Sequence, residues 1–206
     1  MKNAFRHSRR SFIRSSLLSG VAAAVVPPFY RLPAAESPSR ASWSRVALGT
    51  GTDRAKLTFE GLRHFEGVIR RQIQGRRVVI KPNNVSINTP LCATHVDCIE
   101  GILAFLKSIG RTEDILIAES AAGGPTLEGF DNYGYTKLTR QYAVKLVDLD
   151  QEPVEEVHVF DEKDFRPHRA RLSRVLLDPN SFIISATRFK THDRVVATLS
   201  LKNVIF

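Results

Sequence analysis

The sequence has 206 residues, of which 43% are apolar and 25% are charged, a composition typical of a folded globular protein rather than a disordered or fibrous one. Its length predicts one domain with an appendage, and no uncharged apolar run reaches the ~20 residues that span a bilayer, which excludes a polytopic membrane protein. Two cysteines exclude a disulfide scaffold and any four-cysteine iron–sulfur or zinc site within the chain.

The net charge of +9 is concentrated at the amino-terminal end of the chain. Residues 1–35 carry six basic groups and no acidic group, which leaves 24 basic and 21 acidic residues for the rest. A nucleic-acid-binding protein is expected to carry its positive excess on the folded body, with aromatic side chains among the basic ones. The charge distribution therefore predicts no nucleic-acid partner.

The first residues have the order of features found in an export signal. Arg9 and Arg10 are followed by Phe12, and residues 15–26 form an apolar stretch that is too short to span a membrane stably. This pattern resembles a bacterial twin-arginine signal. We expect residues 1–41 to be signal peptide and linker, the twin-arginine translocase to be a partner, and the protein to be periplasmic or otherwise exported. An uncleaved signal that anchors the protein to the membrane and a basic amphipathic start of a cytosolic domain are the alternatives.

Alternating strand and helix patterns begin after the linker. A short apolar strand is predicted at residues 46–48, followed by a helix at 54–74, a strand at 78–80, a helix ending at Gly110 and a strand at 115–118. Thr94 is the expected N-cap of the second helix, because Asp97 follows at the capping-box spacing. Residues 120–131 contain glycine and proline and are predicted to be a loop.

The same alternation continues in the second half of the chain. The pattern predicts a short helix at 133–142, a strand at 144–149, a small antiparallel ribbon near 155–172 and a buried strand at 181–185. Strands separated by helices indicate βαβ units. The expected fold class is therefore α/β, with a mainly parallel sheet, helices on both faces and an antiparallel ribbon insertion.

Polar side chains follow three of the predicted strands where each strand ends. They are Lys81, Asn83 and Asn84 after the second strand, Glu119 and Ser120 after the third, Lys190, Thr191 and His192 after the last, and Lys202 and Asn203 shortly afterwards. In an open parallel sheet the carboxyl ends of the strands share one edge, and ligands bind there. We therefore expect these side chains to line one binding site.

The residue types in this set suit a small anionic ligand. Lysines supply positive charge for a carboxylate or phosphate, and the asparagine amides would orient the ligand. Glu119 and His192 are the candidates for proton transfer. The alternative is structural: Glu119 could pair with a lysine, which would lower its pKa, and the asparagines could be turn residues.

Cys92, His95 and Cys98 are spaced three residues apart. Thiolates and imidazole suit zinc, but no fourth ligand can be named. A disulfide between Cys92 and Cys98, or two partly buried thiols, are the alternatives.

Four segments together resemble the domain of unknown function 362 family. They are IKPNN at 80–84, IAES at 117–120, KTH at 190–192 and TLSLKN at 198–203, and the resemblance covers residues 44–206. Members of this family are uncharacterised, and some are fused to ferredoxin-like iron–sulfur modules. The resemblance implies no reaction, and the two cysteines of this chain lead us to expect no iron–sulfur cluster of its own. Because relatives continue beyond the SLKN element, we expect the domain to be incomplete at its carboxyl end.

Two functions follow as hypotheses. The first is an exported protein that binds a small anionic molecule at the carboxyl edge of its sheet, with enzymatic turnover left open. The second is a non-catalytic accessory module with a redox partner, suggested only by the iron–sulfur fusions of related proteins. An inactive fragment is a third alternative.

Overall fold

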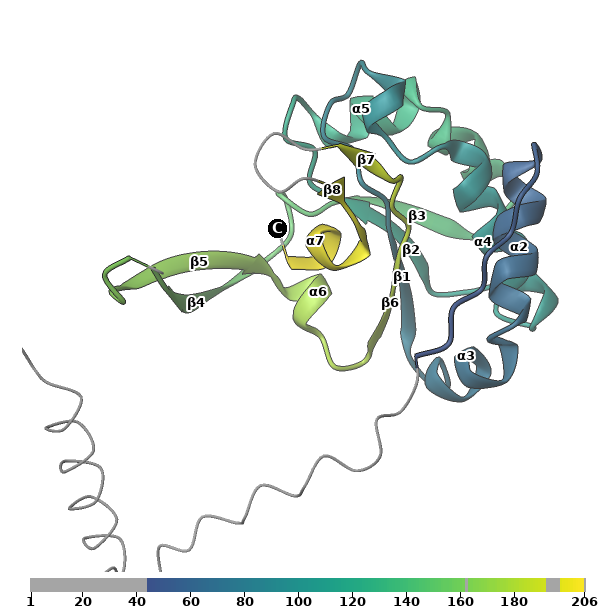
Figure 1. Ribbon diagram of the computed structural model, residues 1–206, viewed down its shortest axis with the longest axis horizontal. Coiled ribbons are helices and arrows are strands. Elements are labelled where there is room, and N and C mark those ends of the chain that lie inside the picture. Colours follow the sequence, from purple (N-terminus) through teal and green to yellow (C-terminus); the bar gives the residue numbers. More distant parts are fainter. Residues whose placement is uncertain (1–43, 162, 192–196, 206) are drawn as a thin grey trace, which may run out of the picture. The chain divides into compact units, whose positions relative to one another are not determined.

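The computed structural model describes residues 44–161, 163–191 and 197–205 (Figure 1). The chain divides into two compact units, Met1–Arg45 and Val46–Phe206, and the described residues fall almost entirely in the second. Within these residues, no helix is both long and apolar enough to cross a membrane. The predicted leader and His192 lie outside the described residues.

Four parallel strands form the central sheet. They are β1 (Arg77–Lys81), β2 (Ile115–Glu119), β3 (Val144–Asp148) and β6 (Ser181–Ser185), in the order β3-β2-β1-β6. Because every neighbouring pair is parallel, all four carboxyl ends lie at one edge. The two central strands are almost completely buried, as their uninterrupted apolar sequences predict. The expected α/β fold with a mainly parallel sheet is confirmed.

Helices cover both faces of this sheet. The helical elements are α2 (Arg54–Arg63), α3 (Glu66–Gln72), η3 (Pro90–Cys92), α4 (Val96–Ser108), α5 (Thr126–Asn132), η4 (Tyr135–Arg140), α6 (Arg174–Leu177) and α7 (Ser200–Ile205). Successive side chains of a strand point to opposite faces. Val78 and Ile80 therefore pack in the large core with α3, α4, α5 and η4, whereas Val79 packs on the other face with Val175 and Leu176 of α6.

Gly101 allows α2 and α4 to approach each other closely. A Cβ atom added to this residue would lie 2.3 Å from the carbonyl oxygen of Ala55 and 2.9 Å from Cβ of Thr58. Such contacts are far inside van der Waals distance, so any side chain at this position would force the two helices apart. The glycine thus fixes the distance between these helices.

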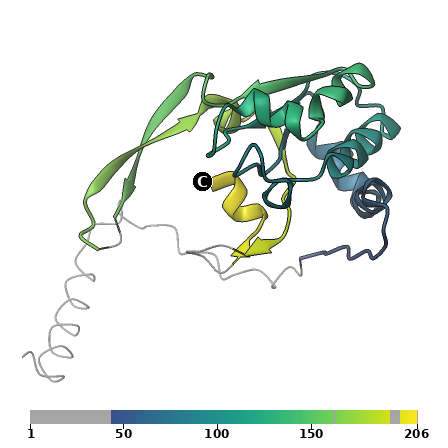
Figure 2. The same ribbon diagram turned by 90° about the horizontal axis from the view of Figure 1, so that it is seen from above.

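The antiparallel ribbon consists of β4 (Val154–Phe160) and β5 (Pro167–Ser173). Its register runs from Val154 opposite Ser173 to Phe160 opposite Pro167, which confirms the predicted insertion. Figures 1 and 2 show the ribbon extending away from the central sheet. A second, shorter antiparallel pair joins β7 (Lys190–Thr191) and β8 (Ala197–Thr198).

Some predicted elements were wrong. Residues 46–48 form no strand, and Val46 and Leu48 are 85% and 92% exposed because no neighbouring strand pairs with them. The long helix expected at 54–74 is divided into α2 and α3. The break lets the two helices take different partners: α2 packs against α4, whereas Ile69 of α3 is buried in the core beside the sheet.

The segment between β2 and β3 also differs from its prediction. The expected loop contains α5, and the expected helix at 133–142 is the 3₁₀ helix η4. Gly134 separates the two helices with a left-handed φ of 81°. His95, not Thr94, is the N-cap of α4, because its Nδ1 accepts a hydrogen bond from the backbone N–H of Asp97.

Candidate functional site

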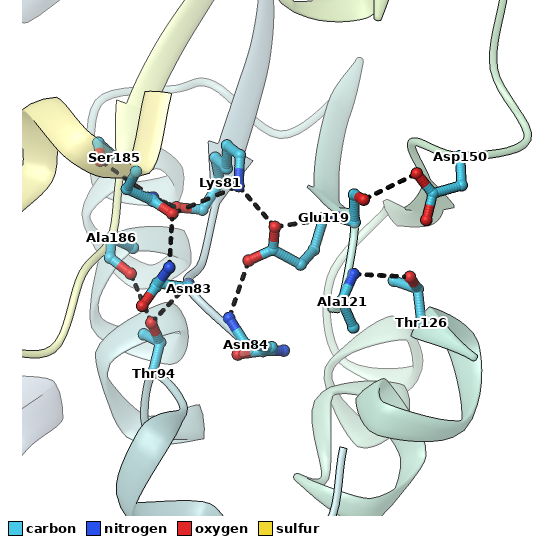
Figure 3. A network of polar contacts seen from close by, with 12 residues as sticks. Lys81, Asn83, Asn84, Thr94, Glu119, Ala121, Thr126, Asp150, Ser185 and Ala186 are labelled. Atoms are coloured by element: carbon cyan, nitrogen blue, oxygen red, sulfur yellow. Dashed lines mark hydrogen bonds and ion pairs between the residues drawn. The ribbon is translucent and has the colours of Figure 1, made fainter. Parts of the chain in front are cut away.

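The ends of β1 and β2 bring Lys81 and Glu119 into direct contact (Figure 3). Lys81 Nζ lies 2.5 Å from Glu119 Oε1, and the two residues are only 5% and 2% exposed. Both residues end a buried strand, so the parallel register that packs the apolar residues also aligns these two charged ones. The sequence interpretation that these strand ends share one edge is confirmed for this pair.

The Glu119 carboxylate has further donors besides Lys81. Its Oε1 accepts a hydrogen bond of 2.9 Å from the Ser120 backbone N–H, and its Oε2 accepts one of 2.9 Å from the Asn84 backbone N–H. Burial raises the pKa of Glu119, while the Lys81 ammonium and these two N–H groups act in the opposite direction. The carboxylate is therefore held in place by three donors in an environment that disfavours its charge.

Asn203 of α7 connects the ends of β1 and β6. Its Nδ2 donates to the carbonyl oxygen of Lys81 at 2.9 Å and to Ser185 Oγ at 3.1 Å. Its Oδ1 accepts from Lys81 Nζ at 3.3 Å and from Asn83 Nδ2 at 3.1 Å. With four partners and 1% exposure, Asn203 binds the last described helix to the site.

A second layer of contacts holds the Asn83–Asn84 turn. Thr94 Oγ1 accepts from the backbone N–H of Asn83 at 2.9 Å and donates to the carbonyl oxygen of Ala186 at 2.6 Å. The hydroxyl of Tyr135 lies 2.6 Å from the carbonyl oxygen of Thr94 and 3.2 Å from Asn84 Oδ1. The turn after β1 is thus held by Thr94, which precedes α4, and by Tyr135 of η4.

A cavity of about 380 Å³ opens above the ion pair. Lys81, Glu119 and Asn203 lie at its inner end. Ser120 and Asp150 form another part of the lining, where Ser120 Oγ donates to Asp150 Oδ1 at 2.7 Å. The base of the ribbon contributes a third part, with Arg171, Leu172 and Ser173. The cavity therefore combines two cations, two carboxylates and several neutral hydrogen-bonding groups.

Other predicted site residues lie elsewhere. The ammonium group of Lys190 donates to the carbonyl oxygen of Cys92, and burial lowers the pKa of this lysine. Thr191 is exposed on β7, and neither it nor the partly buried Lys202 lines the cavity. Asn83 and Asn84 support the site from behind without lining the cavity. The proton-transfer role predicted for His192 concerns a residue outside those that the structure describes.

Cys92 and Cys98 are both free thiols, so the disulfide alternative was wrong. Within the described part of the chain, no group of three or more His, Cys, Asp or Glu side chains is arranged to hold a metal ion. Burial raises the pKa of the Cys98 thiol. The spacing of Cys92, His95 and Cys98 therefore reflects their places on η3 and at the start of α4, not a common ligand.

Sequence reasoning missed several residues of this site. Arg171 and Asp150 line the cavity, and Thr94 and Tyr135 support the turn after β1. Arg171 lies in a run of mixed charges, a pattern typical of a solvated surface, so the sequence gives no sign of its place in a cavity. Asp150 is the one missed residue that the sequence could have indicated. It directly follows a predicted strand, so it lies at the same carboxyl edge of the sheet as Glu119.

Comparison with protein families identifies the domain that carries this site. The family model for the domain of unknown function DUF362 matches residues 78–206, which include every residue of the cavity. The chain belongs to the DUF362 family. Comparisons with curated proteins and with solved structures gave no match. The match begins at β1, so the Lys81–Glu119 pair and Asn203 all lie inside the DUF362 domain.

Proposed function

We propose that this DUF362 protein binds a small molecule with an anionic group in the cavity above Lys81 and Glu119. The observation that carries the proposal is a buried ion pair at the inner end of a cavity. Burying two charges costs desolvation energy that their attraction repays only in part, so such a pair is weak evidence for a stabilising role. Charged groups buried in a concave site are instead frequent at functional centres.

The preference for an anion rests on which donors are already used. An ammonium group has three N–H donors. Glu119 and Asn203 account for two of those on Lys81, which leaves one for a ligand. Arg171 lines the same cavity and forms no ion pair with any residue that the structure describes. Asp150 already accepts from Ser120, and Glu119 accepts from three donors. The donors left for a ligand are therefore on the two cations, Lys81 and Arg171, while Ser120 occupies one oxygen of Asp150.

Proton transfer by Glu119 is part of the proposal. Its raised pKa would allow the carboxyl group to exchange a proton closer to neutrality than an exposed glutamate does. Substitution Glu119→Gln keeps the shape and removes the proton-accepting oxygen. An enzyme of this kind should lose turnover in this variant while retaining ligand binding, whereas a binding protein should show no turnover in either form.

The test begins with native mass spectrometry of the full chain purified from its host, which would identify any bound small molecule. Thermal unfolding with a panel of small carboxylates and phosphates then measures stabilisation by each. Arg171→Gln should abolish the stabilisation by the ligand that is found. Arg169→Gln is the matched control, because Arg169 lies on the same strand, pairs with Glu156 and does not line the cavity. Equal stabilisation of the wild type and the Arg171 variant would contradict the anion-binding role.

We also propose that the protein is exported by the twin-arginine route, supported by Arg9, Arg10 and Phe12 in the sequence. Replacing Arg9 and Arg10 by lysine should retain the protein in the cytoplasm. Unchanged export of this variant would contradict the proposal. Fractionation of the exported protein would separate a soluble form from a form anchored to the membrane by its signal. A redox protein that copurifies in stoichiometric amount would favour the accessory role over the ligand-binding one.

A further inference from the structure

A second cavity of about 270 Å³ lies at the start of α2 and α4, beside the segment that follows β6. Its lining includes Arg54 and Leu57 of α2, His95 and Cys98 at the start of α4, and Arg188 after β6. None of its lining residues is shared with the cavity above Lys81. It is therefore a separate hollow in the same unit.

The charges of this cavity differ from those of the first. Arg54 and Arg188 both line it, and no acidic residue that the structure describes does so. Neither arginine forms an ion pair within the described ranges, although Arg188 Nη1 donates to the carbonyl oxygen of Pro90 at 3.4 Å. Two arginines in the lining and no acidic residue among the described lining residues give the cavity a net positive charge. The first cavity, in contrast, contains equal numbers of basic and acidic groups.

His95 also lines the cavity. Its Nδ1 lies 3.2 Å from the backbone nitrogen of Asp97. The Asp97 carboxylate lies 3.3 Å from Nδ1. Leu57 and Cys98 supply the apolar part of the lining. The cavity is thus polar and cationic in one part and apolar in another.

We propose that this second cavity binds a small phosphate monoester, with the phosphate held by Arg54 and Arg188 and a short carbon group against Leu57 and Cys98. A phosphate monoester carries close to two negative charges at neutral pH, which matches two guanidinium groups. Arginine pairs with phosphate through two parallel hydrogen bonds, so it discriminates in favour of this group. The volume admits a ligand of a few carbon atoms and is small for a nucleotide.

Cys98 provides a direct probe of this cavity. In a Cys92→Ser variant of the full chain, Cys98 is the remaining thiol. Its alkylation by neutral iodoacetamide is measured with inorganic phosphate, with methyl phosphate, and with sodium chloride at the same ionic strength. At a ligand concentration ten times Kd, the rate should fall about tenfold with either phosphate and stay unchanged with chloride.

Substitutions at the two arginines test the assignment. Arg54→Gln and Arg188→Gln should each remove the protection, whereas Arg63→Gln, on the same helix as Arg54 but not lining the cavity, should keep it. Arg169→Gln should also keep it, since Arg169 is an exposed residue of β5 that lines neither cavity. Thermal unfolding midpoints of the same variants with and without phosphate give a second readout. Protection that persists in both arginine variants, or no protection and no stabilisation in the wild type, would overturn the proposal.

Discussion

The substitution Lys81→Met tests how the buried ion pair is balanced. It keeps most of the length of the side chain and removes the charge, so Glu119 stays buried with only the backbone N–H groups of Ser120 and Asn84 as donors. The two side chains of the pair are 7% and 3% exposed, so water cannot replace the lost ammonium group without a structural change. Removing one partner of such a pair costs about 3–5 kcal/mol in free energy of unfolding. This is a large fraction of the roughly 5–15 kcal/mol that stabilises a domain.

The loss should depend on pH in a definite direction. Burial already raises the pKa of Glu119, and the Lys81 ammonium opposes this shift, so its removal raises the pKa further. A raised pKa in the folded state means that the folded state binds a proton more tightly than the unfolded state. Its contribution to stability is present below the ordinary glutamate pKa and is lost as pH rises through the raised value. The variant should therefore approach the wild type in acid and fall behind it at neutral pH.

Urea unfolding followed by far-UV circular dichroism at several pH values measures this difference. Lys145→Met is the control, since Lys145 is an exposed lysine of β3 and should change stability little. In the double variant Lys81→Met, Glu119→Gln, the uncompensated charge is gone, so the loss should be clearly smaller than the sum of the two single losses. A Lys81 variant as stable as the control at neutral pH, or additive losses in the double variant, would refute the reasoning.

Three further predictions concern other parts of the fold. Gly101→Ala should lower the free energy of unfolding by about 1–3 kcal/mol, because its Cβ would meet the backbone of Ala55. Gly61→Ala, in α2 with nothing within 4 Å of the added Cβ, should raise it by about 0.5–1 kcal/mol. Thermal unfolding of both variants tests these opposite changes. Asn203→Leu should lower the free energy of unfolding by at least about 1–3 kcal/mol, because it leaves the carbonyl oxygen and the ammonium group of Lys81 without this buried partner. An unchanged urea midpoint would argue against these contacts. Burial raises the pKa of the Cys98 thiol, so the pH profile of its alkylation rate in the folded Cys92→Ser protein should lie at higher pH than the profile of the same protein unfolded in urea. Coincident profiles would contradict this prediction.

The parts of the site that could be predicted from the sequence are those set by strand periodicity. Lys81 and Glu119 end apolar runs, and parallel pairing brings such ends together whatever the surrounding contacts are. Asn203 was also among the predicted residues, although it reaches the site from a helix rather than from a strand. The predictions of the four sheet strands, the ribbon and α4 succeeded because each rests on a local pattern, whereas residues 46–48 have a similar pattern and form no strand.

The parts that failed depend on tertiary contacts that no local pattern encodes. Lys190 follows the last strand of the sheet, yet its ammonium group is directed to the carbonyl oxygen of Cys92 by the short β7–β8 pair. Thr94 has the sequence context of a helix cap but bridges Asn83 and Ala186. Arg171 reaches the cavity only because of the way the ribbon leaves the sheet, and a run of mixed charges gives no sign of it.

The order of strands in the sheet affects how this protein can be assembled during synthesis. Strands β1, β2 and β3 follow one another along the chain, but the other neighbour of β1 is β6, and Arg77 pairs with Ser181. A nascent chain can therefore assemble three of the four strands early, while one edge of β1 stays open until roughly a hundred more residues have left the ribosome. Asn203 follows β6 in the chain, so its contacts with Lys81 form only after the strand that covers this edge has been synthesised. Until β6 covers it, the exposed edge of β1 offers unpaired backbone groups to any other chain that can pair with it.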